Sequence, residues 1–157
     1  LRHADAAIAG TAARVGAATR DLCEVIDPAA LEHAVAAARE AKRATHEPVR
    51  VAWQAPCSLQ HGQRTSTAGK VEALLRAAGC VLVATRNPTL CCGSAGTYSI
   101  LQPELARELR TRKLDSLLGD QPAWIATANI GCLEHLRQAS AVPVRHWIEI
   151  VDSILFA

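Results

Sequence analysis

The sequence predicts an α/β fold, with a four-stranded, mainly parallel sheet, flanking helices and two preceding Ala-rich helices. Three observations point to this class. Short apolar segments of strand type alternate with amphipathic segments of roughly 10–15 residues, which is typical of βαβ units. The segment 80–84 is almost continuously apolar, which favours a strand buried on both faces. The chain has 157 residues, half of them hydrophobic, so it can bury a sizeable core.

The composition excludes several classes of protein. Lys and Arg number 17 and Asp and Glu 15, a net charge of +2 that gives no reason to expect binding to nucleic acid or an anionic membrane. No apolar run approaches the ~20 residues that a membrane span requires. The chain contains no Met and does not begin with a signal peptide. We therefore expect a piece of a longer polypeptide.

Residues 1–22 form the first expected helix, which is Ala-rich with a sparse apolar stripe. A second helix is expected to begin at Asp27-Pro28, because Asp is a favoured N-cap and Pro is favoured at the first helical position. It is expected to end near 45–48. Both helices should pack on the sheet or on a preceding part of the polypeptide. Their apolar stripes are Ile8, Ala12, Val15 and Leu22 in the first and Leu31, Val35 and Ala38 in the second.

Four later segments have the composition of strands, at residues 49–53, 80–84, 124–128 and 142–146. An amphipathic helix is expected after each. The first should end at Gly79, and the second should run from Pro103 to Gly119, since Pro opens helices and Gly closes them. The apolar faces of the first, second and last of these helices comprise Val71, Leu74, Leu75 and Ala78; Leu105, Leu109, Leu114 and Leu117; and Trp147, Ile150, Val151 and Ile154.

Four cysteines follow three of the predicted strands. Cys57 follows the first strand, Cys91 and Cys92 follow the second, and Cys132 follows the third. Because the carboxyl ends of parallel strands meet at one edge of a sheet, we expect these four thiols to converge there. Four thiolates could bind a four-iron cluster or a zinc ion. A strained disulfide between the two adjacent cysteines is an alternative.

The setting of these cysteines favours thiolates. Cys132 is expected at a helix N-terminus, where the helix dipole stabilises negative charge. Gly93, Gly96 and Gly131 allow close approach of the backbone, so their N–H groups are candidate donors to sulfur.

The remaining cysteines and the histidines are weaker candidates. Cys23 and Cys80 are expected to be small buried side chains, because one lies on a helix face and the other opens a strand. His61, His135 and His146 are possible ligands or supporting groups of the metal site, and equally they could be capping or surface residues. His3, His33 and His46 are expected to be surface or capping residues.

Three segments together resemble a known family. Residues 56–63 (PCSLQHGQ), 90–98 (LCCGSAGTY) and 126–136 (ATANIGCLEHL) look like the cysteine-rich CCG domain. The flanking residues 101–105 (LQPEL) and 143–149 (PVRHWIE) narrow the resemblance to the last CCG domain of glycolate oxidase (glycolate dehydrogenase) iron–sulfur subunits. It covers about residues 48–155. In these terms, residues 1–47 would be a helical segment that connects a preceding domain to the CCG domain at 48–157.

The resemblance implies an electron-transfer subunit of an oxidoreductase. Complete iron–sulfur subunits of this family carry two ferredoxin-type cluster motifs and two CCG domains, of which this chain has one CCG domain. The FAD-containing partner subunits oxidise glycolate, so no substrate chemistry is expected on this chain, and electrons would pass toward the quinone pool. Reducible thiols and the lack of an export signal predict a cytoplasmic location, with attachment to the inner membrane face through partners.

One departure from the family pattern bears on the cluster. CCG domains of the heterodisulfide reductase type end in Cys-x-x-Cys and supply five thiols to a noncubane cluster, whereas here Cys132 is followed by His135. An ordinary four-cysteine [4Fe–4S] cluster held by Cys57, Cys91, Cys92 and Cys132 is therefore our preferred hypothesis. The alternatives are a thiol–disulfide redox subunit similar to heterodisulfide reductase and a zinc-stapled structural docking domain.

Overall fold

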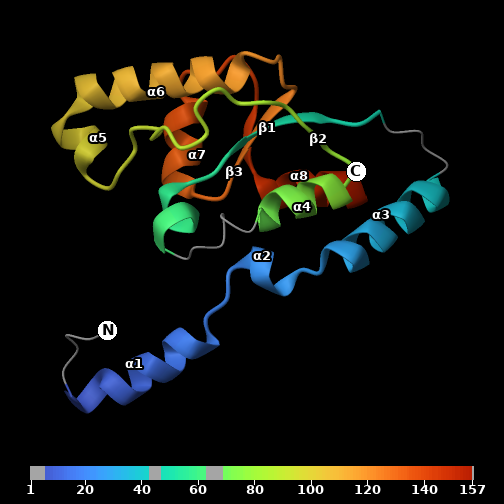
Figure 1. Cartoon of the computed structure of the whole chain (residues 1–157), viewed down its shortest axis with the longest axis horizontal. Helices are drawn as coiled ribbons and strands as arrows, with labels where there is room; N and C mark the ends of the chain where they lie inside the picture. The colour runs from blue at the N-terminus through green and yellow to red at the C-terminus, as the bar shows by residue number, and fades with distance from the viewer. Residues whose placement is uncertain (1–5, 43–46, 63–68, 157) are drawn as a thin grey trace.

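The computed structural model describes residues 6–42, 47–62 and 69–156 (Figure 1). The described strands form one sheet: β1 (Arg50–Gln54), β2 (Val81–Leu82), β3 (Trp124–Thr127) and β4 (Val144–His146). Their order is β2-β1-β3-β4, and all neighbours are parallel. The predicted α/β class and four-stranded parallel sheet are confirmed.

Helices cover both faces of the sheet (Figure 1). One face packs against α4 (Lys70–Ala77) and α8 (Trp147–Phe156), and α3 (Pro28–Lys42) packs in turn on these two helices. The other packs against α6 (Pro103–Leu118) and α7 (Ile130–Arg137). Successive side chains of a strand point to opposite faces, so β1 supplies both cores. Val51 and Trp53 belong to the first core, and Ala52 belongs to the second.

Most predicted helix faces are buried as expected. On the first face, Val71, Leu74 and Leu75 of α4 are buried, and so are Leu31 and Val35 of α3. In α8, the buried residues are Trp147, Ile150 and Val151, with Ile154 half-buried. The Asp27 carboxylate accepts the Ala30 N–H at 2.8 Å and caps α3 as predicted. The expected end of this helix falls partly on residues 43–46, outside the described residues.

The expected first helix is interrupted. Helix α1 (Ala6–Ala18) ends before Asp21, which caps a separate short helix, α2 (Leu22–Val25), through a capping box with Glu24. The stripe is therefore split between two helices. Ile8 and Val15 are 57% and 61% exposed, and α1 lies apart from the sheet in Figure 1. The boundary at residue 47 stays a prediction, although α3 adds side chains to the core.

The segment 80–84 is not buried on both faces. Only Val81 and Leu82 form β2, and Val81 is 44% exposed. The physical reason is the strand order, which places β2 at the edge of the sheet with a single neighbour, β1. The central, buried strands are β1 and β3.

The apolar face of α6 also differs from the prediction. Leu105 is 50% exposed, whereas Ala106 and Lys113 are 1% and 0% exposed. The loop at Gly93 lies against the backbone of α6 at this point, next to the Ala106 carbonyl. Leu114 and Leu117 are buried as expected.

Two further short helices lie outside the expected elements, η1 (Ser58–Gly62, a π-helical turn) and α5 (Tyr98–Leu101). Both lie in the regions that carry cysteines. Among the described residues, no helix is long and apolar enough to span a bilayer.

Candidate functional site

Four cysteines meet at the carboxyl edge of the sheet. Cys57 follows β1, Cys91 and Cys92 lie in the loop after β2, and Cys132 lies on α7 after β3. They line one cavity of about 160 Å³. The other lining residues are Pro56, Ser58, Ser94, Ala95, Gly96 and Asn129. Thiols separated by long stretches of sequence thus share a single cavity.

The four thiols differ in exposure. Cys92 and Cys132 are 3% and 7% exposed, Cys91 is half-buried, and Cys57 is exposed. Cys91 and Cys92 form no disulfide with each other. The cavity is therefore open on the side of Cys57 and closed beneath Cys92 and Cys132.

Cys92 and Cys132 form a coupled pair, with their sulfurs 3.0 Å apart. The hydrogen bond to Cys132 lowers the pKa of the Cys92 thiol, against the opposing effect of burial, and the Ser94 hydroxyl and N–H lower it further. The same shared proton raises the pKa of Cys132. The shared proton therefore favours a thiolate on Cys92 and a protonated thiol on Cys132.

Hydrogen-bond donors surround the sulfurs. The Gly93 N–H donates to Cys91 Sγ at 3.3 Å. The Ser94 hydroxyl oxygen lies 3.3 Å from Cys92 Sγ and 3.8 Å from Cys132 Sγ. Of the glycines predicted as backbone donors, Gly93 makes such a contact, and Gly96 lines the cavity. Ser94 was not predicted as a hydrogen-bond donor to sulfur, although its place directly after the Cys-Cys-Gly triplet could have indicated this role.

Gly93 and Gly131 are constrained by space. Gly93 has a φ of +92°, and a Cβ there would lie 2.5 Å from the Ala106 carbonyl oxygen. A Cβ on Gly131 would lie 3.1 Å from Asn129 Oδ1 and 3.4 Å from Ser94 Oγ. The cysteine loop can therefore approach α6 and α7 closely only because these positions lack a side chain.

The start of α7 is held by Asn129, which caps the helix. Its Oδ1 accepts the Cys132 N–H at 3.2 Å. This contact confirms the predicted placement of Cys132 at the N-terminal turn of a helix, where unpaired N–H groups favour negative charge.

A buried polar pair joins the strand ends beneath the cavity. The Thr127 hydroxyl donates to Gln54 Oε1 at 2.5 Å, and these side chains are 0% and 2% exposed. Gln54 Nε2 donates to the Ala55 carbonyl at 3.0 Å. Because Gln54 and Thr127 end β1 and β3, the pair fixes the relative position of the segments that lead to Cys57 and Cys132. No sequence pattern predicted this hydrogen bond between Gln54 and Thr127.

None of the histidines that the structure describes lines the cavity. His135 Nε2 lies 3.2 Å from the Ala106 carbonyl oxygen, behind Gly93. His146 Nδ1 accepts the Ile148 N–H at 3.3 Å and so caps α8. His61 is exposed in η1, and His33 is exposed in α3. His3 and His46 lie outside the described residues.

The donor set of the cavity suits a metal that prefers sulfur, since it offers four thiols and no carboxylate. Within the part of the chain that the structure describes, no three or more His, Cys, Asp or Glu side chains form a group that could hold a single metal ion as they stand. The thiols are therefore gathered in one cavity without being arranged around one point.

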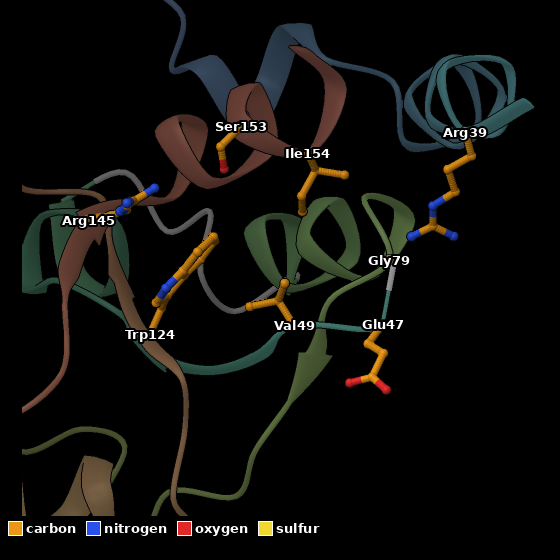
Figure 2. Close-up of a pocket in the computed structure, with 8 residues that line it drawn as sticks. All are labelled: Arg39, Glu47, Val49, Gly79, Trp124, Arg145, Ser153 and Ile154. Atoms are coloured by element: carbon orange, nitrogen blue, oxygen red, sulfur yellow. The ribbon is translucent and has the colours of Figure 1, made fainter. Parts of the chain in front are cut away.

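A second cavity, of about 320 Å³, lies at the opposite, amino edge of the sheet (Figure 2). Trp124, the first residue of β3, forms one wall, and the Arg145 guanidinium lies 4.6 Å from its ring centroid. Arg39, Ile154 and Gly79 form other parts of the wall. No cysteine lines this cavity, so it lacks the sulfur donors found at the carboxyl edge.

The chain thus forms a parallel α/β domain with a cysteine-lined cavity at its carboxyl edge, which places it in the class of cysteine-rich domains. Residues 51–137 match the model of the cysteine-rich domain family CCG, and the chain belongs to this family.

Curated relatives share much of the sequence. The chain is 41% identical over 151 residues to the glycolate oxidase iron-sulfur subunit of Escherichia coli (strain K12), a match that covers 96% of this chain and 34% of that protein. It is 29% identical over 94 residues to the probable glycolate oxidase iron-sulfur subunit of Bacillus subtilis (strain 168), covering 60% of this chain and 21% of that protein. The chain thus spans about a third or less of the length of these relatives.

A third relative has a different name. The chain is 31% identical over 68 residues to lactate utilization protein A of Oceanobacillus iheyensis, a match that covers 40% of this chain and 28% of that protein.

Proposed function

We propose that this chain is an electron-transfer module that binds an iron–sulfur cluster at Cys57, Cys91, Cys92 and Cys132. The observation that carries the proposal is the convergence of these four thiols on one cavity. Four cysteine thiolates are the usual ligands of a [4Fe–4S] cluster. Such a cluster takes one thiolate at each iron, so it does not require three donors around a single ion.

The surroundings of the thiols support this assignment. The contact between Cys92 and Cys132 favours a thiolate on Cys92, and the Gly93 and Ser94 donors lie within hydrogen-bond distance of sulfur. Metal ligation requires thiolates, and hydrogen bonds to ligand sulfurs tune the potential of a cluster. The exposed Cys57 marks the side on which an electron partner could approach the centre.

The relatives suggest the setting of this module. By similarity to the iron-sulfur subunits of glycolate oxidase, we propose that it accepts electrons from FAD-containing subunits that oxidise glycolate or another 2-hydroxy acid, and passes them toward quinone. The match to a lactate utilization protein leaves the acid to be identified by experiment. We propose a cytoplasmic location, with membrane attachment through partners.

Anaerobic reconstitution with iron and sulfide tests the proposal. We expect about four irons and four sulfides per chain, a brown colour and an EPR signal after reduction. Cys132→Ser should lose most of the bound iron, whereas Cys80→Ser, which alters a buried thiol outside the cavity, should retain it. Colourless wild-type protein that binds one zinc tightly and no iron would contradict the proposal.

A further inference from the structure

Lys113 is a fully buried cation on α6. Its side chain is 0% exposed, and its ammonium donates to the Pro88 carbonyl at 2.9 Å and the Asn87 carbonyl at 3.3 Å. Among the described residues, no Asp or Glu side chain forms an ion pair with it. Two carbonyl oxygens stabilise this ammonium only in part, so a negative charge nearby in the same core would stabilise it further.

Lys113 lies on the helix that covers the buried cysteines. Burial lowers the pKa of its ammonium on balance, and negative charge on the cysteines of the cavity acts in the opposite direction. The helix that carries Lys113 packs on the same face of the sheet as Cys92 and Cys132, inside the same apolar core. In this low-dielectric setting, electrostatic interactions are stronger than at a surface.

The same side chain also holds the cysteine loop. Asn87 and Pro88 immediately precede the segment that carries Cys91 and Cys92. The Asn87 N–H donates to the Ser116 hydroxyl at 3.0 Å, one turn further along α6. Two residues of α6 therefore fix this loop, and only Lys113 brings a charge to it.

We propose that Lys113 is a positioning residue whose buried positive charge compensates the negative charge of the sulfur-liganded centre and favours its reduced form. The inference rests on the proposed function and extends it to a residue outside the cavity lining. One-electron reduction adds one negative charge to the centre without adding a proton, and in the test the electron comes from dithionite, which is oxidised. A buried cation stabilises the more negative of the two charge states.

The test compares three variants of the reconstituted protein. Lys113→Gln removes the charge and keeps a hydrogen-bond donor. Ser116→Ala weakens the same loop attachment without a change of charge, and is the matched control. Lys113→Arg keeps the charge. The readouts are the iron content and the midpoint potential from an EPR-monitored titration, neither of which depends on enzymatic activity.

We expect Lys113→Gln to lower the equilibrium constant for reduction at least about tenfold, which is about 59 mV for one electron, while Ser116→Ala stays at the wild-type potential. Equal shifts in the two variants, or an unchanged potential in Lys113→Gln, would overturn the inference. If Lys113→Gln fails to hold iron, retention by Lys113→Arg supports the role of charge, and loss in both shows a packing role and overturns it. Wild-type protein without iron would overturn the proposed function itself.

Discussion

The six cysteines of this chain fall into two sets with different surroundings. Cys57, Cys91, Cys92 and Cys132 lie at the carboxyl edge of the sheet, among hydrogen-bond donors and in a shared cavity. Cys23 and Cys80 are 4% and 5% exposed and lie in the apolar core on the face covered by α3, α4 and α8.

The comparison shows how position in the fold divides one residue type into two chemistries. Burial raises the pKa of Cys80 to about 11, and the nearby Arg39 lowers it only in part. Cys92 is equally buried, yet hydrogen bonds from Cys132 and Ser94 lower its pKa below the ordinary thiol value. Burial alone therefore makes a thiol inert, whereas burial together with directed donors makes it a thiolate.

Alkylation of the cluster-free protein should separate the two sets most clearly. Cys57 is exposed and should react with iodoacetamide at pH 8, somewhat more slowly than a free thiol because burial of part of its side chain raises its pKa. Cys80 should react on the order of a thousandfold more slowly, since it needs opening of the core. Peptide mass mapping measures both rates, and comparable rates would remove the distinction.

Substitution of Gly93 tests how closely the loop that carries Cys91 and Cys92 packs against α6. Gly93→Ala should lower the free energy of unfolding by about 3 kcal/mol or more, because it combines an unfavourable φ with a Cβ 2.5 Å from the Ala106 carbonyl. The matched control is Gly96→Ala, where φ is +50° but no atom lies within 4 Å. It should cost only about 1–2 kcal/mol. Urea unfolding gives both values, and equal costs would argue against close packing of this loop.

The pH dependence of stability tests the environment of Cys80, one of the two cysteines in the apolar core. The pKa of Cys80 is about 11 in the folded protein, against an ordinary thiol value of 9.0. The folded state therefore binds more protons than the unfolded state between these values, and stability is lost as pH rises from 9 to 11. The loss attributable to this thiol should be about 2–3 kcal/mol.

Other groups titrate in this range, so the measurement is the difference between wild-type protein and Cys80→Ala in urea unfolding at pH 8 and pH 11. The stability of the wild type should fall more steeply than that of the variant. If the stabilities of the wild type and of Cys80→Ala fell equally between pH 8 and pH 11, ionisation of Cys80 would not contribute to the loss of stability.

Much of the site could be predicted because it depends on chain order. In a parallel sheet, the residue that follows each strand lies at the same edge wherever it stands in the sequence. The positions of Cys57, Cys92 and Cys132 after their strands were therefore sufficient to predict that they share an edge. The helix start at Cys132 was also predictable, since Asn129 is a local capping signal.

Other features depended on contacts that no local pattern reports. The segment around Val81 is apolar enough for a central strand, but it pairs with β1 alone. Leu105 fits an apolar stripe better than Lys113, yet the lysine is the residue that faces inward. His135 and His146 lie near the cysteines in sequence, yet neither lines the cavity, and their contacts with the Ala106 carbonyl and the start of α8 could not be predicted from a local pattern. Their role as supporting groups stays a prediction.

The amino-acid sequence by itself determined the alternation of strands and helices and the placement of cysteines after the strands, because periodicity and chain order are local properties. The tertiary structure decided which strand is at the edge, which side chain of α6 is buried, and how Gln54 and Thr127 join beneath the cavity. These outcomes follow from the free energy of packing and of buried polar groups, which depends on neighbours far away in the chain.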